Sequence, residues 1–322
     1  MKLMVEGEPR FPTTEELVPT KYPPQVLLDV TNRCPLSCIR CPVPILRKEP
    51  GYHPSDMPLP LFQKLADQMS NSSILTITGD GEPLVVRDLP KMVHYATEKG
   101  ITVRLITSGL ILSERVTREL LESQLDFIDF SLDAATEESY NQVRLDSNYR
   151  KVIGNVNRFL ELRNEIQGEN PTTKVLVSMI DQPETHHEIA DFFTLWQNRA
   201  DRVYVRPLHS VAGYVPMESR KDVGNSPSRI PCRILWDRLV VNHKGDVYFC
   251  PLGWGRKEAL LGNINQETIQ EIWNGDSLNQ IRENHIGHNI PGGILCHNCP
   301  DWRSFTWGDS SGQYLRELLE KS

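Results

Sequence analysis

Seven cysteines carry the clearest chemical signal in this sequence, and three of them stand close together near its start. Cys34, Cys38 and Cys41 have the spacing C-x3-C-x2-C and directly follow the short apolar run 26–30. Thiolate ligands suit iron–sulfur clusters, and three of them can hold three corners of a four-iron cube. One iron would then have no protein ligand and could bind a second molecule. A zinc knuckle or three unrelated buried cysteines is the alternative, but zinc usually requires a fourth protein ligand.

The other four cysteines form a second group in the last third of the chain. Cys232 and Cys250 flank an expected β-hairpin, and Cys296 and Cys299 form a C-x2-C pair. Four thiolates make a closed site, which suits either zinc or a fully ligated iron–sulfur cube, and spacing alone leaves both open. Two separate metal sites explain this division better than a disulfide framework does.

An alternation of apolar runs and amphipathic runs must position these cysteines. The expected strands cover 25–32, 74–79, 102–107, 127–132, 174–180 and 202–208. The expected helices that follow them cover 58–69, 89–99, 113–123, 137–144, 149–166 and 184–199. Six such units predict an α/β fold with a parallel sheet and crossover helices, curled into a partial (β/α)6 TIM-like barrel. Chemistry in such folds gathers at the carboxyl ends of the strands, where the first cysteine group lies.

The pattern changes after residue 225. A hairpin over 237–249 and two short helices near 268–273 and 278–284 predict a small α+β domain that holds the second cysteine group. The expected domains are an N-terminal arm, the barrel, the auxiliary domain and a C-terminal helix, over 1–24, 25–225, 226–310 and 311–322.

Bulk composition limits the partners of the protein. The 322 residues are 39% apolar and 24% charged, with a net charge of −7 and no basic block. We therefore expect no nucleic-acid partner. No apolar run approaches the ~18 residues of a membrane span, and the first residues lack the apolar core of a signal peptide. We expect no membrane association and a cytoplasmic location, where thiols stay reduced and cysteines serve as ligands or catalysts.

The motifs in the barrel resemble those of the radical S-adenosylmethionine (SAM) family. The first cysteine group matches the cluster motif of that family, and residues 80–83, Asp-Gly-Glu-Pro, are similar to its Gly-Gly-Glu-Pro motif. Residues 131–133, Ser-Leu-Asp, resemble a segment that helps to hold SAM. Asp80 replaces the first glycine, and Arg40 stands where the family usually places an aromatic residue near the adenine.

The end of the chain resembles the SPASM/Twitch extension of the same family. Residues 261–264 and 271–274 and the Cys296-x2-Cys299 pair follow the usual layout of that extension. With four cysteines it is similar to the shorter Twitch version, which carries one auxiliary 4Fe–4S cluster.

The resemblance implies two 4Fe–4S clusters and SAM as cofactors, and an electron donor of the flavodoxin or ferredoxin type. In the family, SAM binds the open iron and its cleavage gives a 5′-deoxyadenosyl radical, which abstracts hydrogen from an unactivated C–H bond. The implied ligands are Cys34, Cys38 and Cys41 for the first cluster and Cys232, Cys250, Cys296 and Cys299 for the second. The residues implied in SAM binding are Gly81, Glu82, Pro83, Ser108, Ser131, Asp133, Arg144 and Met179. A solvated position for Arg144 and a core position for Met179 are the alternatives.

Three residues are candidates for catalysis. Arg206 and His209, at the end of the sixth strand, are expected to face the substrate, where Arg206 could bind an oxyanion or a hydroxyl group. A structural ion pair is the alternative for Arg206. Asp80 is a candidate base, and capping of a turn is the competing account. The candidate walls of the substrate pocket are Tyr204, Tyr214 and Trp254, for which simple packing is the alternative.

The main functional hypothesis is oxidation of a small polyol, aminocyclitol or sugar alcohol to a ketone. The spacing of the late cysteines resembles that of the 2-deoxy-scyllo-inosamine dehydrogenases within the family. Removal of hydrogen from a carbinol carbon leaves a radical that must lose a proton and an electron, and a fully ligated second cluster suits the electron. The two clusters use all seven cysteines, so no thiol remains to return a hydrogen atom, which argues against a thiol-quenched epimerase.

Two other classes stay open. Many SPASM relatives modify ribosomal peptides by crosslinking, often with a leader-peptide recognition domain. Only 33 residues precede Cys34, and we expect no folded recognition domain among them, although a partner protein could supply one. An epimerising or eliminating enzyme belongs to the same alternative. A non-catalytic zinc or iron–sulfur protein would need only the second cysteine group.

Overall fold

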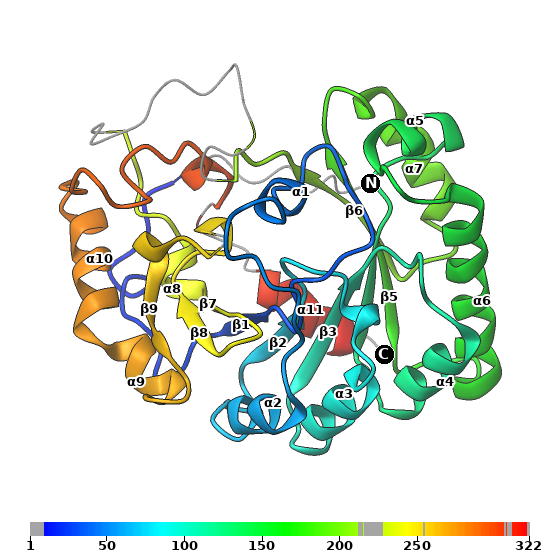
Figure 1. The fold of residues 1–322 in the computed structure, drawn as a ribbon, viewed down its shortest axis with the longest axis horizontal. Coiled ribbons are helices and arrows are strands. Elements are labelled where there is room, and N and C mark those ends of the chain that lie inside the picture. The colour runs from blue at the N-terminus through cyan, green and yellow to red at the C-terminus, as the bar shows by residue number, and fades with distance from the viewer. Residues whose placement is uncertain are drawn as a thin grey trace.

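Six parallel strands and the helices that follow them build most of the molecule (Figure 1). The computed structural model describes residues 10–211, 215, 228–253, 255–305, 307 and 311–320. The strands are β1 (Gln25–Leu28), β2 (Ile74–Ile77), β3 (Thr102–Thr107), β4 (Phe127–Ser131), β5 (Lys174–Asp181) and β6 (Arg202–Pro207). Each pairs in parallel with the next, which confirms the predicted parallel sheet of a partial barrel.

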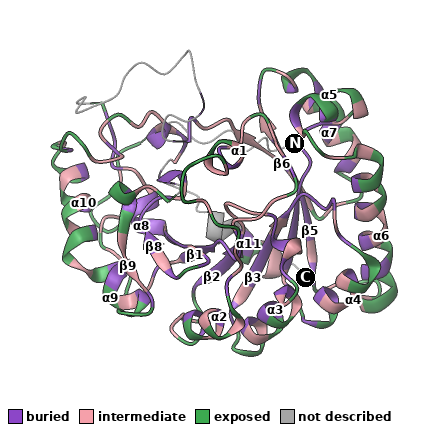
Figure 2. Ribbon diagram, viewed as in Figure 1, coloured by how far each residue is buried: buried purple, intermediate pink, exposed green. Residues whose placement is uncertain are grey.

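Helices cover the outer face of this sheet and are amphipathic, as the sequence predicts. They are α2 (Leu59–Ala66), α3 (Leu89–Glu98), α4 (Glu114–Glu122), α6 (Tyr149–Gln167) and α7 (Ile189–Trp196), and α5 (Glu137–Val143) precedes α6. The short helix α1 (Val43–Leu46), which the sequence does not predict, follows the cysteine loop near the mouth of the barrel. Side-chain caps fix where several begin: the Ser113 hydroxyl accepts from the Val116 N–H, and the Asn148 side chain accepts from the Lys151 N–H. Figure 2 shows their exposed residues on the outside and the strands buried beneath them.

The auxiliary region continues the barrel sheet, which the sequence pattern does not predict. β7 (Arg238–Val241) pairs in parallel with β1, and β8 (Asp246–Tyr248) and β9 (Leu260–Asn263) follow antiparallel. The result is one nine-stranded sheet in the order β6-β5-β4-β3-β2-β1-β7-β8-β9. A hairpin pattern reports only local antiparallel pairing, so the long-range pairing of β7 with β1 has no sequence signature.

Short helices surround the end of this sheet. They are α8 (Ile234–Asp237), α9 (Ile269–Asn274) and α10 (Asp276–Ile286). The described part of the N-terminal arm lies against them, because the indole N–H groups of Trp236 and Trp273 donate to the carbonyl oxygens of Leu17 and Thr20, at 2.8 and 2.7 Å. The arm is thus held by the auxiliary region.

The C-terminal helix α11 (Ser311–Glu320) closes the amino-terminal end of the barrel. Leu315 is fully buried in a cluster with the strand residues Ile74, Phe127, Leu176 and Tyr204. The Arg316 guanidinium donates to the carbonyl oxygen of Ser72 at 2.6 Å, just before β2. Figure 1 shows α11 at the centre of the curved sheet. Among the described residues, no helix combines the length and apolar character needed to cross a membrane.

Candidate active site

A cavity of about 1020 Å³ fills the barrel and opens at the carboxyl ends of the strands. Alternate residues of each strand point into it, as the period of two in a β-strand requires. Its lining from β1, β2 and β3 includes Gln25, Leu27, Asp29, Thr76, Thr78, Asp80, Arg104, Ile106 and Ser108. Its lining from β4 to β8 includes Ser131, Asp133, Ile180, Gln182, Tyr204, Arg206, Val240, Asn242, Tyr248 and Cys250. The cavity has room for SAM and a second molecule.

The first cysteine group lies at the mouth of this cavity. Cys34, Cys38 and Cys41 all line it, and all three are free thiols. Burial raises the pKa of each thiol, that of Cys41 to about 12. Thiolates in such a place need a positive partner, and iron ions supply one, so the donor set fits an iron–sulfur cluster.

Gly81 allows the Asp-Gly-Glu-Pro segment, residues 80–83, to pack closely against the backbone of the cysteine loop. A Cβ atom at this position would lie 2.4 Å from the Thr31 carbonyl oxygen and 2.7 Å from the Arg33 carbonyl oxygen. The neighbouring Glu82 N–H donates to the same Arg33 oxygen at 2.9 Å. Glycine is therefore required here by the close approach of two backbones.

The Glu82 carboxylate is held by β3. It accepts from the Thr107 hydroxyl at 2.6 Å and from the Ser108 N–H and hydroxyl at 2.9 and 2.5 Å. It also accepts from the Leu84 N–H at the start of the turn that Pro83 opens. Glu82, Pro83 and Ser108 all line the cavity, so the structure brings these three predicted residues together.

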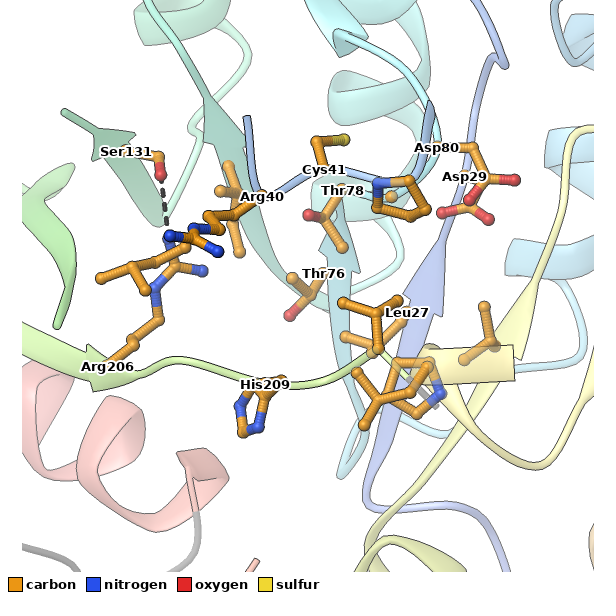
Figure 3. A pocket seen from close by; sticks show the side chains of 18 of the residues that line it. Leu27, Asp29, Arg40, Cys41, Thr76, Thr78, Asp80, Ser131, Arg206 and His209 are labelled. Carbon is orange, nitrogen blue, oxygen red and sulfur yellow. Dashed lines mark hydrogen bonds between the residues drawn. The ribbon is translucent and has the colours of Figure 1, made fainter. Parts of the chain in front are cut away.

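Ser131, Asp133 and Arg144 form the neighbouring part of the wall, at the end of β4. Arg144 pairs with Asp133, and its Nη2 donates to the Ser131 hydroxyl at 2.6 Å. Arg206 donates to the same hydroxyl at 2.8 Å, as Figure 3 shows. Burial opposes the charge of Arg144, but Asp133 and the Cys38 thiolate outweigh it and raise the pKa of Arg144. The alternative of a solvated Arg144 is wrong, because this side chain is buried between the cysteine loop and β4.

Met179 does not line the cavity. It is fully buried in the hydrophobic core, while its neighbour Ile180 lines the cavity. Successive side chains of a strand point to opposite faces, so Met179 faces the helices. The prediction that Met179 lines a ribose and adenine pocket is therefore wrong, and the core alternative holds.

Arg40 joins the cysteine loop to the far side of the barrel. It forms an ion pair with Glu184, which follows β5, and it lines the cavity. Its Nε and that of Arg206 have no hydrogen-bond partner among the described residues. Two buried donors in the cavity wall fit ligands that carry acceptor groups.

Asp80 lies beside Asp29, a residue that the sequence reasoning missed. Both line the cavity at the carboxyl ends of β2 and β1, and Figure 3 shows them together. Burial raises the pKa of Asp80 to about 7, and burial and the charge of Asp80 raise the pKa of Asp29 well above its usual value. A carboxylate at the end of the otherwise apolar run 26–30 was the available signal.

His209 links the barrel to the auxiliary region. Its ring stacks on Phe305 with centroids 5.0 Å apart, and the next residue, Ser210, donates to Asp301 from its N–H and hydroxyl at 2.8 and 2.7 Å. His209 and Tyr204 both line the cavity. The predicted wall residues Tyr214 and Trp254 lie outside the described residues.

The second cysteine group surrounds a small cavity of about 20 Å³. Its lining includes Cys232, Cys250, Cys296 and Cys299. Burial raises the pKa of all four thiols, that of Cys299 to about 11. Cys250 also lines the large cavity, so residues of both cysteine groups border the same cavity.

Comparison with known proteins agrees with this arrangement. The family model described as the radical SAM superfamily matches residues 28–194, just over half of the chain. The chain belongs to this superfamily. Residues 232–300 match the SPASM iron–sulfur cluster-binding domain. The cofactors of this enzyme are accordingly SAM, the 4Fe–4S cluster of the radical SAM domain and additional iron–sulfur cluster binding in the SPASM domain.

The relatives of this radical SAM protein include peptide cyclases. A PqqA peptide cyclase from Xanthomonas campestris pv. campestris (strain 8004) is 33% identical over 328 residues, covering 91% of this chain and 83% of that protein. A second PqqA peptide cyclase, from Granulibacter bethesdensis, is 29% identical over 126 residues, which is 38% of this chain and 33% of that protein.

Two solved structures share the fold. BtrN in complex with AdoMet and 2-DOIA has a TM-score of 0.58 and 18% identity, with 86% of this chain and 92% of that chain covered. Streptococcus suis SuiB bound to precursor peptide SuiA has a TM-score of 0.64 and 16% identity, with 96% and 75% covered.

Proposed function

We propose that this radical SAM enzyme oxidises a carbinol carbon of a small polyol, aminocyclitol or sugar alcohol to a ketone. The observation that carries the proposal is the position of Cys250. It lines the same cavity as Cys34, Cys38 and Cys41, so a substrate in that cavity lies beside the second cysteine site. An electron released by the substrate would have a short route to that site.

The two cofactor sites follow from the residues at each end of the cavity. When bound, the first cluster and SAM supply a 5′-deoxyadenosyl radical, which removes one hydrogen atom from the substrate. In this proposal the first cysteine group holds that cluster, and the SAM site comprises Gly81, Glu82, Pro83, Ser108, Ser131, Asp133 and Arg144. A flavodoxin- or ferredoxin-type protein supplies the electron that starts the reaction.

The substrate must then lose one proton and one electron to become a ketone. Asp80, with Asp29 beside it, has the raised pKa of a base that works near neutral pH, and it takes the proton. The electron passes to the four-cysteine site. Arg206 lies across the cavity with an unpartnered Nε and binds a substrate hydroxyl group, and His209 also lines this space.

Peptide modification is the second candidate function. It is favoured by the PqqA peptide cyclases, one of which is 33% identical across most of this chain. A cavity of about 1020 Å³ that opens at the carboxyl edge of the barrel also admits a peptide side chain. The two candidates differ in substrate but share the same first step of hydrogen abstraction.

Anaerobically reconstituted enzyme separates the two candidates. The enzyme is incubated with SAM, a flavodoxin reducing system and either a panel of deuterated aminocyclitols and polyols or a set of short precursor peptides. The proposal expects a ketone from one of the small substrates, with deuterium transferred to 5′-deoxyadenosine. A crosslinked peptide with no small-molecule ketone would replace the main proposal by the second candidate.

Two sets of variants test the roles of the cysteine groups. Replacing Cys34, Cys38 and Cys41 by Ala is expected to abolish 5′-deoxyadenosine. Replacing Cys296 and Cys299 by Ala is expected to abolish the ketone while leaving uncoupled SAM cleavage. Equal loss of both products in the second variant would contradict the role of the second site as an electron acceptor.

A further inference from the structure

Arg229 lies in the wall of the four-cysteine cavity, close to the sulfur atoms. It is 3% exposed, and it precedes Cys232 by three residues. Its Nη2 donates to the Cys296 carbonyl oxygen at 2.7 Å, and its Nη1 donates to the His297 carbonyl oxygen at 3.2 Å. The guanidinium is therefore fixed beside the C-x2-C pair by two hydrogen bonds to backbone.

The positive charge of Arg229 is held beside the cysteines. The guanidinium lines the same small cavity as Cys232, Cys296 and Cys299. Arginine stays protonated under these conditions because its ordinary pKa exceeds about 12. A full positive charge is thus held where water is largely excluded, and its effect on nearby charges is stronger there than at the surface.

The other polar side chain that lines this cavity is His285. It is 2% exposed, and its Nδ1 accepts from the Cys232 N–H at 3.3 Å, so this nitrogen carries no proton and the ring is neutral. The remaining lining side chains, Ile234, Leu252, Leu295, Trp302 and Phe305, are apolar. Arg229 is therefore the positive group among the described residues that line this cavity.

We propose that Arg229 raises the reduction potential of the auxiliary iron–sulfur cluster and so makes it a better electron acceptor. Net charge and hydrogen bonding near a cluster are among the factors that set its potential. Addition of an electron makes a cluster more negative, and a buried guanidinium beside it favours that reduced state. The inference depends on a cluster in the SPASM region and is independent of which substrate is oxidised or crosslinked.

A purely structural role is the competing explanation, because Arg229 also holds the Cys296–Cys299 turn through its carbonyl oxygens. The two roles predict different behaviour for lysine at this position. Lysine keeps the positive charge but loses the two-pronged geometry of the guanidinium. Glutamine keeps polar donors but loses the charge. If Arg229 acts through its charge, the glutamine variant changes the reduction potential of the cluster and the lysine variant does not. If Arg229 acts only by holding the turn, both variants lose iron.

The test measures the midpoint potential of the auxiliary cluster alone. Full-length protein with Cys34, Cys38 and Cys41 replaced by Ala retains only the four late cysteines as cluster ligands. Iron and sulfide content are measured for this background and for Arg229→Gln, Arg229→Lys and Arg303→Gln within it. Potentials follow from anaerobic redox titration monitored by electron paramagnetic resonance. Arg303 is the matched control, since it packs over the same Trp302 ring at 5.0 Å but does not line the cavity.

The expected result is a full cluster in Arg229→Lys with a potential close to that of the background protein. Arg229→Gln is expected to shift the potential to more negative values, clearly further than Arg303→Gln does. If Arg229→Gln fails to hold iron, the lysine variant decides alone, and a full cluster with an unchanged potential supports the proposal. An unchanged potential in Arg229→Gln with full iron, an equal shift in the lysine variant, or loss of the cluster from the lysine variant would each overturn it.

Discussion

The carboxyl groups of Asp29 and Asp80 lie side by side in one part of the cavity wall, as Figure 3 shows. Burial disfavours the ionised form of both, and the charge of Asp80 further raises the pKa of Asp29. Two such carboxyl groups resist being ionised together. The pair is a consequence of aspartate at position 80, where the family motif has glycine.

The first prediction concerns stability. The pKa of Asp80 rises from 3.8 to about 7 on folding, so between these pH values the folded protein holds a proton that the unfolded chain has lost. The free energy of unfolding must therefore fall as the pH rises through this window. Asp80→Asn removes the ionisable group and therefore this fall in the free energy of unfolding. We expect the substitution to stabilise the protein by on the order of 2 kcal/mol near pH 8, with little effect near pH 4.

Anaerobic urea unfolding of the reconstituted protein at several pH values measures this effect. Asp67→Asn is the control, because it is expected to lower the free energy of unfolding where Asp80→Asn raises it. The Lys99 ammonium holds the pKa of Asp67 below its ordinary value, so neutralising Asp67 removes a stabilising contact above pH 4. A gain from Asp80→Asn that is equal at low and high pH would contradict the raised pKa of Asp80.

The second prediction concerns the rate of the reaction. If Asp80 takes the substrate proton, only its ionised form is active, so ketone formation should decline as the pH falls below about 7. Asp80→Asn should lower the rate by roughly 10²-fold or more and remove this limb of the pH profile. Rates of 5′-deoxyadenosine and ketone formation are measured side by side. An unchanged pH profile in Asp80→Asn would assign the proton to another group.

Much of the barrel could be predicted from the sequence because its signals are local. The strand 102–107 is predicted at its observed bounds, because a run rich in β-branched residues lies between two glycines, Gly100 and Gly109, that have positive φ. The parallel arrangement followed from the alternation of strands and helices, and it brought the motifs of β1, β2 and β4 to one edge. The hydrophobic pattern of each strand and helix already indicates which of its faces is buried, and the packing of the barrel agrees with that pattern.

The features that escaped prediction depend on contacts between distant residues. β7 joins β1 across more than half of the chain, and Arg40 pairs with Glu184 across 144 residues. No spacing rule connects such residues. The side of the strand taken by Met179 was also missed, because the last residues of a buried strand are apolar on both faces. Arg229 gave no signal, since a single arginine near a cysteine is common.

The third prediction separates two arginines that share one hydroxyl group. Arg144 pairs with Asp133 and lies beside Cys38, whereas Arg206 approaches Ser131 from β6. Arg144→Lys should therefore weaken SAM binding and lower 5′-deoxyadenosine formation by roughly 10²-fold, because lysine cannot reproduce a bidentate contact. Arg206→Lys should instead lower ketone formation and leave most of the uncoupled SAM cleavage. Equal effects of both substitutions on SAM affinity would place Arg206 in the SAM site.

The fourth prediction compares two glycines. Gly81→Ala would press a methyl group against the Thr31 and Arg33 carbonyl oxygens, which belong to backbone and cannot rotate away. We expect loss of iron from the first cluster site and of SAM cleavage, with the auxiliary cluster retained. Gly154→Ala, in open space on helix α6, is the control and should stabilise the protein by about 0.5–1 kcal/mol. Full iron content in Gly81→Ala would show that the loop tolerates displacement.

The fifth prediction tests the core position of Met179. Because this side chain is fully buried away from the cavity, Met179→Leu should cost less than about 1.5 kcal/mol and leave SAM affinity unchanged. Met179→Ala should cost about 2–5 kcal/mol through the cavity that it creates, again with little change in SAM affinity of the folded protein. Isothermal titration with SAM, beside urea unfolding, measures both quantities. A several-fold loss of SAM affinity in Met179→Leu, with stability unchanged, would show that Met179 contacts the cofactor after all.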